Sequence, residues 1–245
     1  HPGRRAGYHI PKGYITANAI SFIILMGGSM YQFILFDLDG TITNSELGIL
    51  ASVRYALGKL GAAEPDYPTL RKFIGPPLRD SFRDYCGLSP ERAEEAVRLY
   101  REWYAPHGKL DCAVYPGIPK LLRDLHAAGK TVALATSKPE GFARDILEHF
   151  GLDRYFTAIC GAALDGSRDR KIDVLRYLLG QFPDRKPEET VLIGDTRFDM
   201  EGAALAGIDG IGVLYGFGSR EELENGGAKA LAETAEELHK LLLAQ

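Results

Sequence analysis

The amino-acid sequence predicts an α/β fold: a Rossmann-like parallel sheet with helices on both faces, and a small α-helical cap domain inserted after the first strand. Short apolar runs alternate with amphipathic segments of about ten residues, a pattern typical of right-handed βαβ units. One long stretch, residues 46–113, contains no convincing strand and indicates helices only. The predicted strands end in polar groups, and ligands bind at such ends in open parallel sheets.

Four apolar runs are predicted to be buried strands of this sheet. Each is rich in β-branched, aromatic or leucine residues and stops at a polar or turn-forming residue, as expected for strands covered on both faces. The predicted strands are YQFILF at 31–36, TVALA at 131–135, TVLI at 190–193 and GIGVL at 210–214.

The segments between these strands are predicted to be helices, because their apolar residues recur at three- and four-residue spacing. Gly129, Gly151 and Gly207 follow three of them, and glycine is typical of the residue just after a helix. The predicted helices span 118–128, 140–150, 171–181 and 198–206, and a last helix over 228–243 closes the chain.

The helical stretch 46–113 is predicted to form the cap, and 30–45 with 114–245 the catalytic core. Polar or turn-forming residues at both junctions suit hinges. Glycine and proline residues divide the cap into four predicted helices, near 46–60, 68–73, 78–85 and 90–105.

Residues 1–29 are expected to be a disordered N-terminal extension outside the fold. Their apolar run, 19–26, is too short to span a bilayer. Cations precede this run, so a secretory signal is the alternative interpretation. However, no small-x-small cleavage site follows cleanly, and strand-like sequence begins directly after Met30.

The composition narrows the class of protein. The net charge is −4 and no basic stretch stands out, which argues against nucleic-acid or membrane-surface binding. Three widely spaced cysteines without a CxxC pair indicate reduced thiols in a cytoplasmic protein. The composition does not decide the oligomeric state, and we expect a monomer.

Acidic residues follow two of the predicted strands. Asp37 and Asp39 lie two apart in locally extended chain, so their side chains should point the same way, and Asp195 follows another strand. Such a cluster repels itself unless a cation binds, and all-oxygen ligands suit Mg²⁺. The sequence therefore predicts a magnesium site. Asp199 is either a further ligand or an acid at a helix N-terminus.

Four motifs in order resemble the haloacid dehalogenase-like hydrolase superfamily across residues 31–245. They are DLDGT at 37–41, LATSKP at 134–139, Lys171, and LIGDTRFD at 192–199. The helical insert resembles the cap of the subgroup in which the cap follows the first strand. RKFIGPPLRDSF at 71–82, VYPGIPKLL at 114–122 and GVLYGFGSREEL at 212–223 resemble phosphoglycolate phosphatase-like members.

The resemblance implies a role for each matching acid. Asp37 would attack phosphorus and form an aspartyl-phosphate. Asp39 would protonate the leaving group and later deprotonate water. Asp37, the backbone carbonyl of Asp39, and Asp195 would hold Mg²⁺, with Asp199 acting through water or from behind these ligands.

The same resemblance implies phosphate-binding residues. Thr136 would donate its hydroxyl to a phosphate oxygen, together with backbone N–H groups around Ser137 at a helix start. Lys171 alone would read as a surface lysine, but its match to the motif implies that it neutralises charge on the phosphoryl group. Lys138 is either a ligand of this kind or a helix-capping or loop residue.

The cap offers weaker signals. Gly75 lies in a Gly-Pro-Pro corner that could present a loop to the leaving group. Arg79 and Lys72 either meet a second anionic group of the substrate or are ordinary solvated cations. Three aromatic residues at helical spacing are predicted to pack inside the cap: Tyr100, Trp103 and Tyr104.

The resemblance thus implies a Mg²⁺-dependent phosphatase acting on small-molecule phosphate monoesters. Phosphoglycolate is the leading substrate and a nucleoside 5′-monophosphate its close rival. Asp39 favours phosphoryl chemistry, since dehalogenases of this superfamily lack an acid at that position. A sugar phosphomutase remains open, because it shares the two-aspartate chemistry, and so does a catalytically silent regulatory domain.

Overall fold

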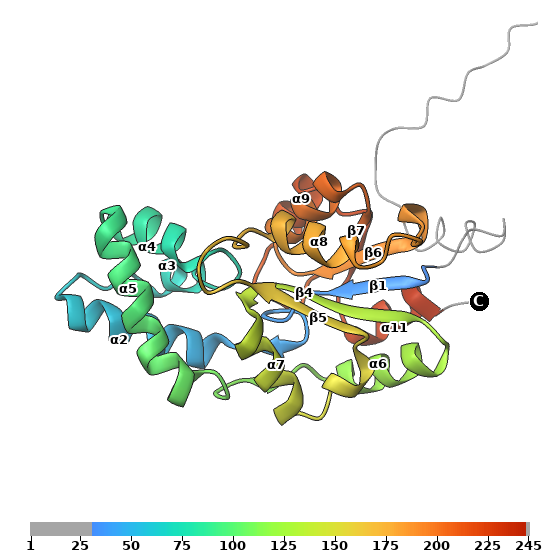
Figure 1. Ribbon diagram of the computed structural model, residues 1–245, viewed down its shortest axis with the longest axis horizontal. Coiled ribbons are helices and arrows are strands. Elements are labelled where there is room, and N and C mark those ends of the chain that lie inside the picture. The colour runs from blue at the N-terminus through green and yellow to red at the C-terminus, as the bar shows by residue number, and fades with distance from the viewer. Residues whose placement is uncertain (1–30, 244–245) are drawn as a thin grey trace, which may run out of the picture.

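The computed structural model describes residues 31–243, arranged as a sheet-containing part and a helical part at one end of it (Figure 1). The expectation for residues 1–29 lies outside the described residues. No helix within 31–243 combines the length and apolar character needed to cross a membrane.

A six-stranded parallel sheet forms the centre of the larger part, in the order β5-β4-β1-β6-β7-β8. Strand β1 is central and fully buried, and its Phe33 pairs with Thr131 on one side and Thr190 on the other. The strands are β1 (Phe33–Phe36), β4 (Thr131–Pro139), β5 (Ala158–Ala162), β6 (Thr190–Gly194), β7 (Asp209–Val213) and β8 (Ala230–Ala232).

Helices cover both faces of the sheet. Alternate residues of β1 point to opposite faces and therefore pack against different helices. Ile34 and Phe36 pack in one apolar cluster with α6, α7 and α11, and Phe33 and Leu35 pack in another with α8 and α9. The predicted Rossmann-like fold is confirmed. The helices are α6 (Ile118–Ala127), α7 (Glu140–His149), α8 (Lys171–Gly180), α9 (Arg197–Ala206), α10 (Arg220–Asn225) and α11 (Ala235–Leu243), with short turns η2 (Asp153–Tyr155) and η3 (Pro187–Glu189).

The predicted last helix over 228–243 is wrong in its first part. Residues 230–232 form β8, which pairs in parallel with β7, and α11 begins only at Ala235. An Ala-Leu-Ala string favours helix locally, but the open edge of β7 supplies partners for its backbone groups. Strand β5 was not predicted, because its AICGA string lacks a clear apolar alternation.

The helical part comprises residues between β2 (Thr43–Asn44) and β3 (Ala113–Val114), two short antiparallel strands at its base. It has an apolar cluster of its own, which includes Leu57, Leu70 and Phe82. We call this part the cap. Its helices are α2 (Glu46–Leu60), α3 (Tyr67–Arg71), α4 (Leu78–Cys86), α5 (Pro90–Trp103) and the π-helical turn η1 (Tyr104–Gly108).

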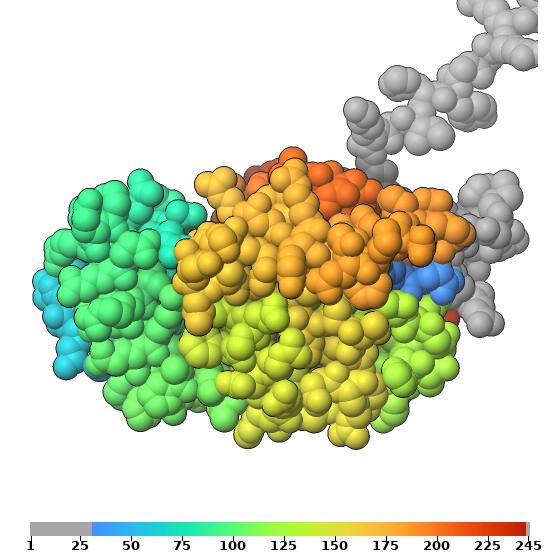
Figure 2. All heavy atoms as spheres, viewed as in Figure 1, coloured from blue at the N-terminus to red at the C-terminus, as the bar shows by residue number. Residues whose placement is uncertain are grey.

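The cap touches the core directly. Figure 2 shows the gold segment between β5 and α8 against the green helices of the cap. There Arg79 forms an ion pair with Asp169, and Arg101 Nη1 donates to the Leu164 carbonyl at 3.4 Å. Near β3, Lys109 Nζ lies 2.6 Å from Asp145 Oδ2. The structure therefore shows the cap closed onto the core.

Candidate active site

The site is built at the carboxyl end of β1, in the middle of the sheet. The Asp37 N–H donates to the Ile193 carbonyl at 2.9 Å, which holds Asp37 against β6. The chain then turns sharply, because the Leu38 carbonyl accepts from the N–H groups of Thr41, Ile42 and Thr43. Because of this turn, the alternating side-chain direction of strand β1 does not continue beyond Asp37.

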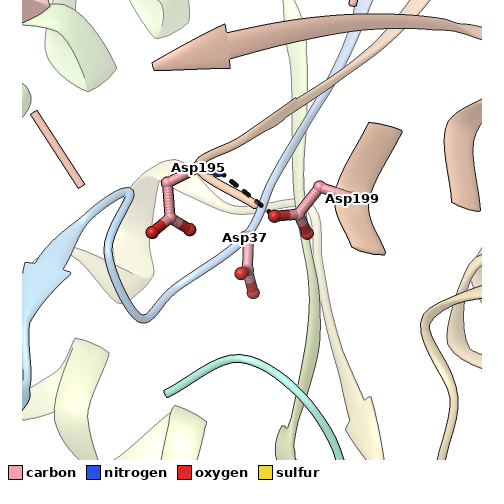
Figure 3. A group of neighbouring side chains, drawn as sticks. All are labelled: Asp37, Asp195 and Asp199. Carbon is pink, nitrogen blue, oxygen red and sulfur yellow. Dashed lines mark hydrogen bonds between the residues drawn. The ribbon is translucent and has the colours of Figure 1, made fainter. Parts of the chain in front are cut away.

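Three buried carboxylates meet at this point, those of Asp37, Asp195 and Asp199 (Figure 3). One oxygen from each lies within 4.8 Å of the others. The expectation that the Asp39 side chain would share this cluster is not met, because the turn after Asp37 directs it elsewhere. Its Oδ1 instead accepts from Ser45 Oγ at 2.6 Å.

Asp199 is the third acid of the cluster and also caps helix α9, which confirms the interpretation as an acid at a helix N-terminus. Its Oδ2 accepts from the backbone N–H groups of Asp195 and Thr196 at 3.2 and 3.1 Å. The Thr196 hydroxyl donates to the same oxygen at 3.0 Å. Its Oδ1 faces Lys171 Nζ at 2.9 Å. These contacts fix the carboxylate in place.

Glycine residues allow the chain to approach the acid cluster closely. A Cβ on Gly40, where φ is +82°, would lie 2.0 Å from Asp195 Oδ2. A Cβ on Gly194 would lie 2.2 Å from Asp199 Cγ. Asp195 Oδ2 also accepts from the Phe217 N–H at 2.8 Å. The backbone therefore shapes a tight pocket around the three carboxylates.

Lys171 is buried, so the interpretation as a surface lysine is wrong. Its Nζ lies 3.0 Å from Asp37 Oδ1 and 2.9 Å from Asp199 Oδ1, and it donates to the Ala135 carbonyl at 2.8 Å. Burial lowers the pKa of Lys171, but the charges of Asp199 and Asp37 outweigh this and raise it overall. The residue is therefore a fixed cation at the first residue of α8.

The acid cluster fits a divalent cation. Burial raises the pKa of Asp37 to about 7, although Lys171 opposes the shift, and burial together with Asp199 raises the pKa of Asp195 well above its usual range. Carboxylate oxygens at such spacing are ligands typical of Mg²⁺. Within residues 31–243, every buried charged residue belongs to this site: Asp37, Asp39, Lys138, Lys171, Asp195 and Asp199.

The end of β4 supplies the next group. Thr136 is buried, and its Oγ1 accepts from the Lys138 N–H at 3.1 Å. Ser137 lies within β4 rather than at a helix start, since the strand runs to Pro139 and α7 begins at Glu140. The strand is longer than predicted because it pairs with β5 again at Pro139, after a register shift.

A cavity between cap and core opens onto Asp39. Gly75 and Arg79 line it, whereas Lys72 lies outside it over the Tyr85 ring. Arg79 is already paired with Asp169 and Glu94. The remaining wall is largely apolar and aromatic, and includes Ile49, Phe73, Val97, Tyr100, Tyr104, Ser137, Lys138 and Phe142.

Comparison with known proteins identifies the family. The sequence pattern of the haloacid dehalogenase-like hydrolases matches residues 34–213. The chain belongs to this family. A 5′-nucleotidase from Pseudomonas aeruginosa is 47% identical over 193 residues, covering 79% of this chain and 87% of the relative. The tyrosine-protein kinase PtkA of Mycobacterium tuberculosis is 41% identical, covering 88% and 74%.

Two further similarities bear on this haloacid dehalogenase-like hydrolase. A phosphoglycolate phosphatase from Pseudomonas putida is 30% identical, covering 79% of this chain and 73% of the relative. The crystal structure of a predicted phosphatase from Clostridium acetobutylicum superimposes with a TM-score of 0.85 at 43% identity, covering 89% and 100% of the two chains. The predicted family, its phosphoglycolate phosphatase-like subgroup and the enzyme class, a phosphatase, are confirmed.

At the cavity, sequence reasoning about this hydrolase left Lys138 undecided, assigned Tyr104 to packing and missed Arg101. Lys138 is buried and lies 3.0 Å from Asp39 Oδ1, so it is not a mere capping or loop residue. Tyr104, assigned to packing within the cap, reaches Lys138 with its hydroxyl. Arg101 lines the cavity, and its buried Nε has no hydrogen-bond partner among the described residues. The only sequence signal was their position, beside a strand end or near the end of a cap helix.

Proposed function

We propose that this phosphatase is Mg²⁺-dependent and hydrolyses small-molecule phosphate monoesters through an aspartyl-phosphate on Asp37. One observation carries the proposal. Asp37 is a buried carboxylate that contacts a fixed cation, Lys171, at 3.0 Å and clusters with two further carboxylates at the end of the central strand. This arrangement supports the proposed roles of Asp37 as nucleophile, of Lys171 as the charge-stabilising group and of the carboxylates as metal ligands.

The metal would be held by Asp37, Asp195 and the backbone carbonyl of Asp39, with Asp199 orienting them or binding through water. Bound Mg²⁺ supplies positive charge that screens the anionic nucleophile from the anionic substrate. Asp195 suits this role because no lysine or arginine within residues 31–243 forms an ion pair with it.

The protein's own groups perform two displacements. A carboxylate oxygen of Asp37 forms a bond to phosphorus while the ester P–O bond breaks, and Asp39 gives its proton to the departing oxygen. Water then bonds to phosphorus, loses a proton to Asp39, and releases Asp37. Lys171 stabilises negative charge near Asp37, and the Thr136 hydroxyl donates to a phosphoryl oxygen.

The cavity wall and the relatives favour a nucleoside 5′-monophosphate as substrate. The 47%-identical relative is named a 5′-nucleotidase, and rings of Tyr100, Tyr104 and Phe142 line the cavity, where a planar base can stack. Arg101 supports phosphoglycolate as the second candidate. Its buried Nε has no hydrogen-bond partner within residues 31–243, and a carboxylate on the leaving group would supply one.

The test is phosphate release from a panel containing phosphoglycolate, nucleoside 5′-monophosphates and sugar phosphates, with Mg²⁺ or with chelator. We expect release only with Mg²⁺, and none from Asp37→Asn. Asp184→Asn, the same substitution at an exposed position, is the matched control and should keep full activity. Release that ignores chelator, or that survives Asp37→Asn, would refute the mechanism.

Two alternatives differ in what receives the phosphoryl group. A sugar phosphomutase would be activated by a sugar bisphosphate and release little phosphate. A relative is named a tyrosine-protein kinase, so the assay also follows transfer from ATP to protein. We expect water to be the acceptor. Free phosphate should then equal the ester consumed, and no label should remain on protein after alkali has cleaved acyl-phosphates.

A further inference from the structure

The acid–base residue Asp39 is held by two donors on one of its oxygens. Ser45 Oγ donates to Asp39 Oδ1 at 2.6 Å, and Lys138 Nζ lies 3.0 Å from the same atom. The hydrogen bond and the ion pair of Asp39 within residues 31–243 both reach Oδ1, and neither reaches Oδ2. Because Asp39 lines the cavity, the oxygen left open is the one available to substrate.

Lys138 is in turn held by the cap. The Tyr104 hydroxyl contacts Lys138 Nζ, which also lies 4.6 Å from the centre of the Tyr104 ring. Both side chains are buried, with 2% exposure for Tyr104 and 8% for Lys138. Tyr104 stacks on Tyr100 at 5.2 Å and meets the core residue Phe142 edge-on at 5.3 Å. The contact to Lys138 therefore exists only while the cap lies on the core.

Tyr104 occupies a rigid place in the cap. It opens the π-helical turn η1, a feature frequent at functional sites. The turn is packed against α2 so closely that a Cβ on Gly48 would lie 1.9 Å from the Gly108 carbonyl oxygen. The position of the hydroxyl is thus set by the cap as a body, and it moves with the cap.

From these contacts we propose that Lys138 is a positioning residue that orients Asp39 for proton transfer, and that Tyr104 completes this arrangement when the cap closes. The inference rests on the proposed function of Asp39. It couples cap closure to catalysis: with the cap open, Lys138 loses Tyr104 and Asp39 loses a fixed partner. The Oδ2 atom then no longer faces the leaving oxygen reliably.

The test compares two esters that differ in their need for a proton. An alkyl phosphate, the best substrate of the panel, needs protonation of its leaving oxygen, whereas 2,4-dinitrophenyl phosphate does not. For Lys138→Met we expect kcat/KM to fall about 10²-fold on the alkyl ester, the cost of a misplaced catalytic group, and at most about threefold on the aryl ester. Tyr104→Phe should give the same pattern at roughly a tenth of the size.

Hydrolysis of the aspartyl-phosphate, the second chemical step, provides a second measurement. Asp39 must also accept the proton of the attacking water, so Lys138→Met should slow release of phosphate from Asp37. With the aryl ester this predicts a burst of dinitrophenolate of one equivalent per enzyme, followed by slow turnover. The matched control is Lys186→Met, the same substitution at an exposed lysine of the core that pairs with its neighbour Glu189, away from the cap and the cavity. It should leave the ratio of the two esters unchanged.

Equal losses on both esters, or no burst, would overturn the proposal. The double variant of Lys138→Met and Asp39→Asn gives another test. If it were about 10²-fold slower than Asp39→Asn alone, the proposal would also fail, because two substitutions that act through the same carboxylate should not have multiplicative effects on the rate. If the wild-type protein released phosphate from neither ester, the proposed function itself would fail, which is a different result.

Discussion

Replacing Asp195 with Asn is expected to stabilise the metal-free protein while abolishing its response to Mg²⁺ and its phosphatase activity. Asp195 is fully buried, and no cation within residues 31–243 pairs with it. Its neighbours in the cluster, Asp37 and Asp199, repel its charge and contribute to its raised pKa. Removing one charge therefore relieves repulsion that only a bound cation would otherwise offset.

The magnitude follows from the spacing of the cluster. Two unit charges 4.8 Å apart repel by about 3.5 kcal/mol at an effective dielectric constant of about 20. Lys171 offsets part of this, because it contacts both other carboxylates. The amide also accepts a weaker hydrogen bond from the Phe217 N–H, a loss of about 1 kcal/mol. The net gain is about 1–3 kcal/mol, or roughly 2–10 °C in Tm for a chain of this size.

The assay is thermal unfolding in chelator and in excess Mg²⁺. In chelator Asp195→Asn should melt above the wild type, and Mg²⁺ should raise the Tm of the wild type by mass action but leave that of Asp195→Asn unchanged. The matched control is Asp209→Asn, since Asp209 pairs favourably with Lys229 at 2.6 Å and accepts from the Tyr31 hydroxyl at 2.7 Å. That variant should melt lower and keep its Mg²⁺ response. An Asp195→Asn protein that is less stable in chelator would refute the reasoning.

Three further outcomes are expected. In chelator, the unfolding free energy should fall as pH rises from about 4 to about 7, because burial raises the folded-state pKa of Asp37 to about 7 and the folded state then binds more protons than the unfolded chain. Denaturant titrations at several pH values check this. An unfolding free energy that rises over that window would contradict it. Arg79→Gln, which removes the ion pair with Asp169, should enlarge the radius of gyration and raise KM a few-fold with kcat nearly unchanged, measured by X-ray scattering and kinetics. Gly40→Ala should cost about 1–3 kcal/mol of stability and weaken Mg²⁺ binding in a metal titration, because its Cβ would lie 2.0 Å from Asp195 Oδ2 at a φ of +82°.

The central sheet could be predicted because its strands are short, buried on both faces and bounded by polar turns. The runs that became β1, β4, β6 and β7 needed no tertiary information. By contrast, the string that forms β8 favours helix by itself, and only the unpaired edge of β7 makes it a strand. The sheet's edges were therefore the part that local pattern could not predict.

Within the site, Asp37 and Asp195 were predictable because each directly follows a strand, where the fold itself determines their direction. Asp39 was misplaced because the extended alternation was carried past the end of β1 into a turn. Lys138 was undecided for another reason. Its partner Tyr104 comes from the cap, 34 residues away in sequence, and no local pattern encodes that contact.

The six buried charged residues of the site are not evenly paired. Four carboxylates and two ammonium groups leave two negative charges in an apolar surrounding, which one divalent cation would neutralise. The lysines are not shared: Lys171 contacts Asp37 and Asp199, whereas Lys138 contacts Asp39. The excess charge therefore lies around Asp195, whereas the proposed nucleophile Asp37 and the proposed acid–base residue Asp39 each keep a cation of their own. Since Lys138 is the lysine that the cap reaches, the proposed closure would act on Asp39 without disturbing Asp37.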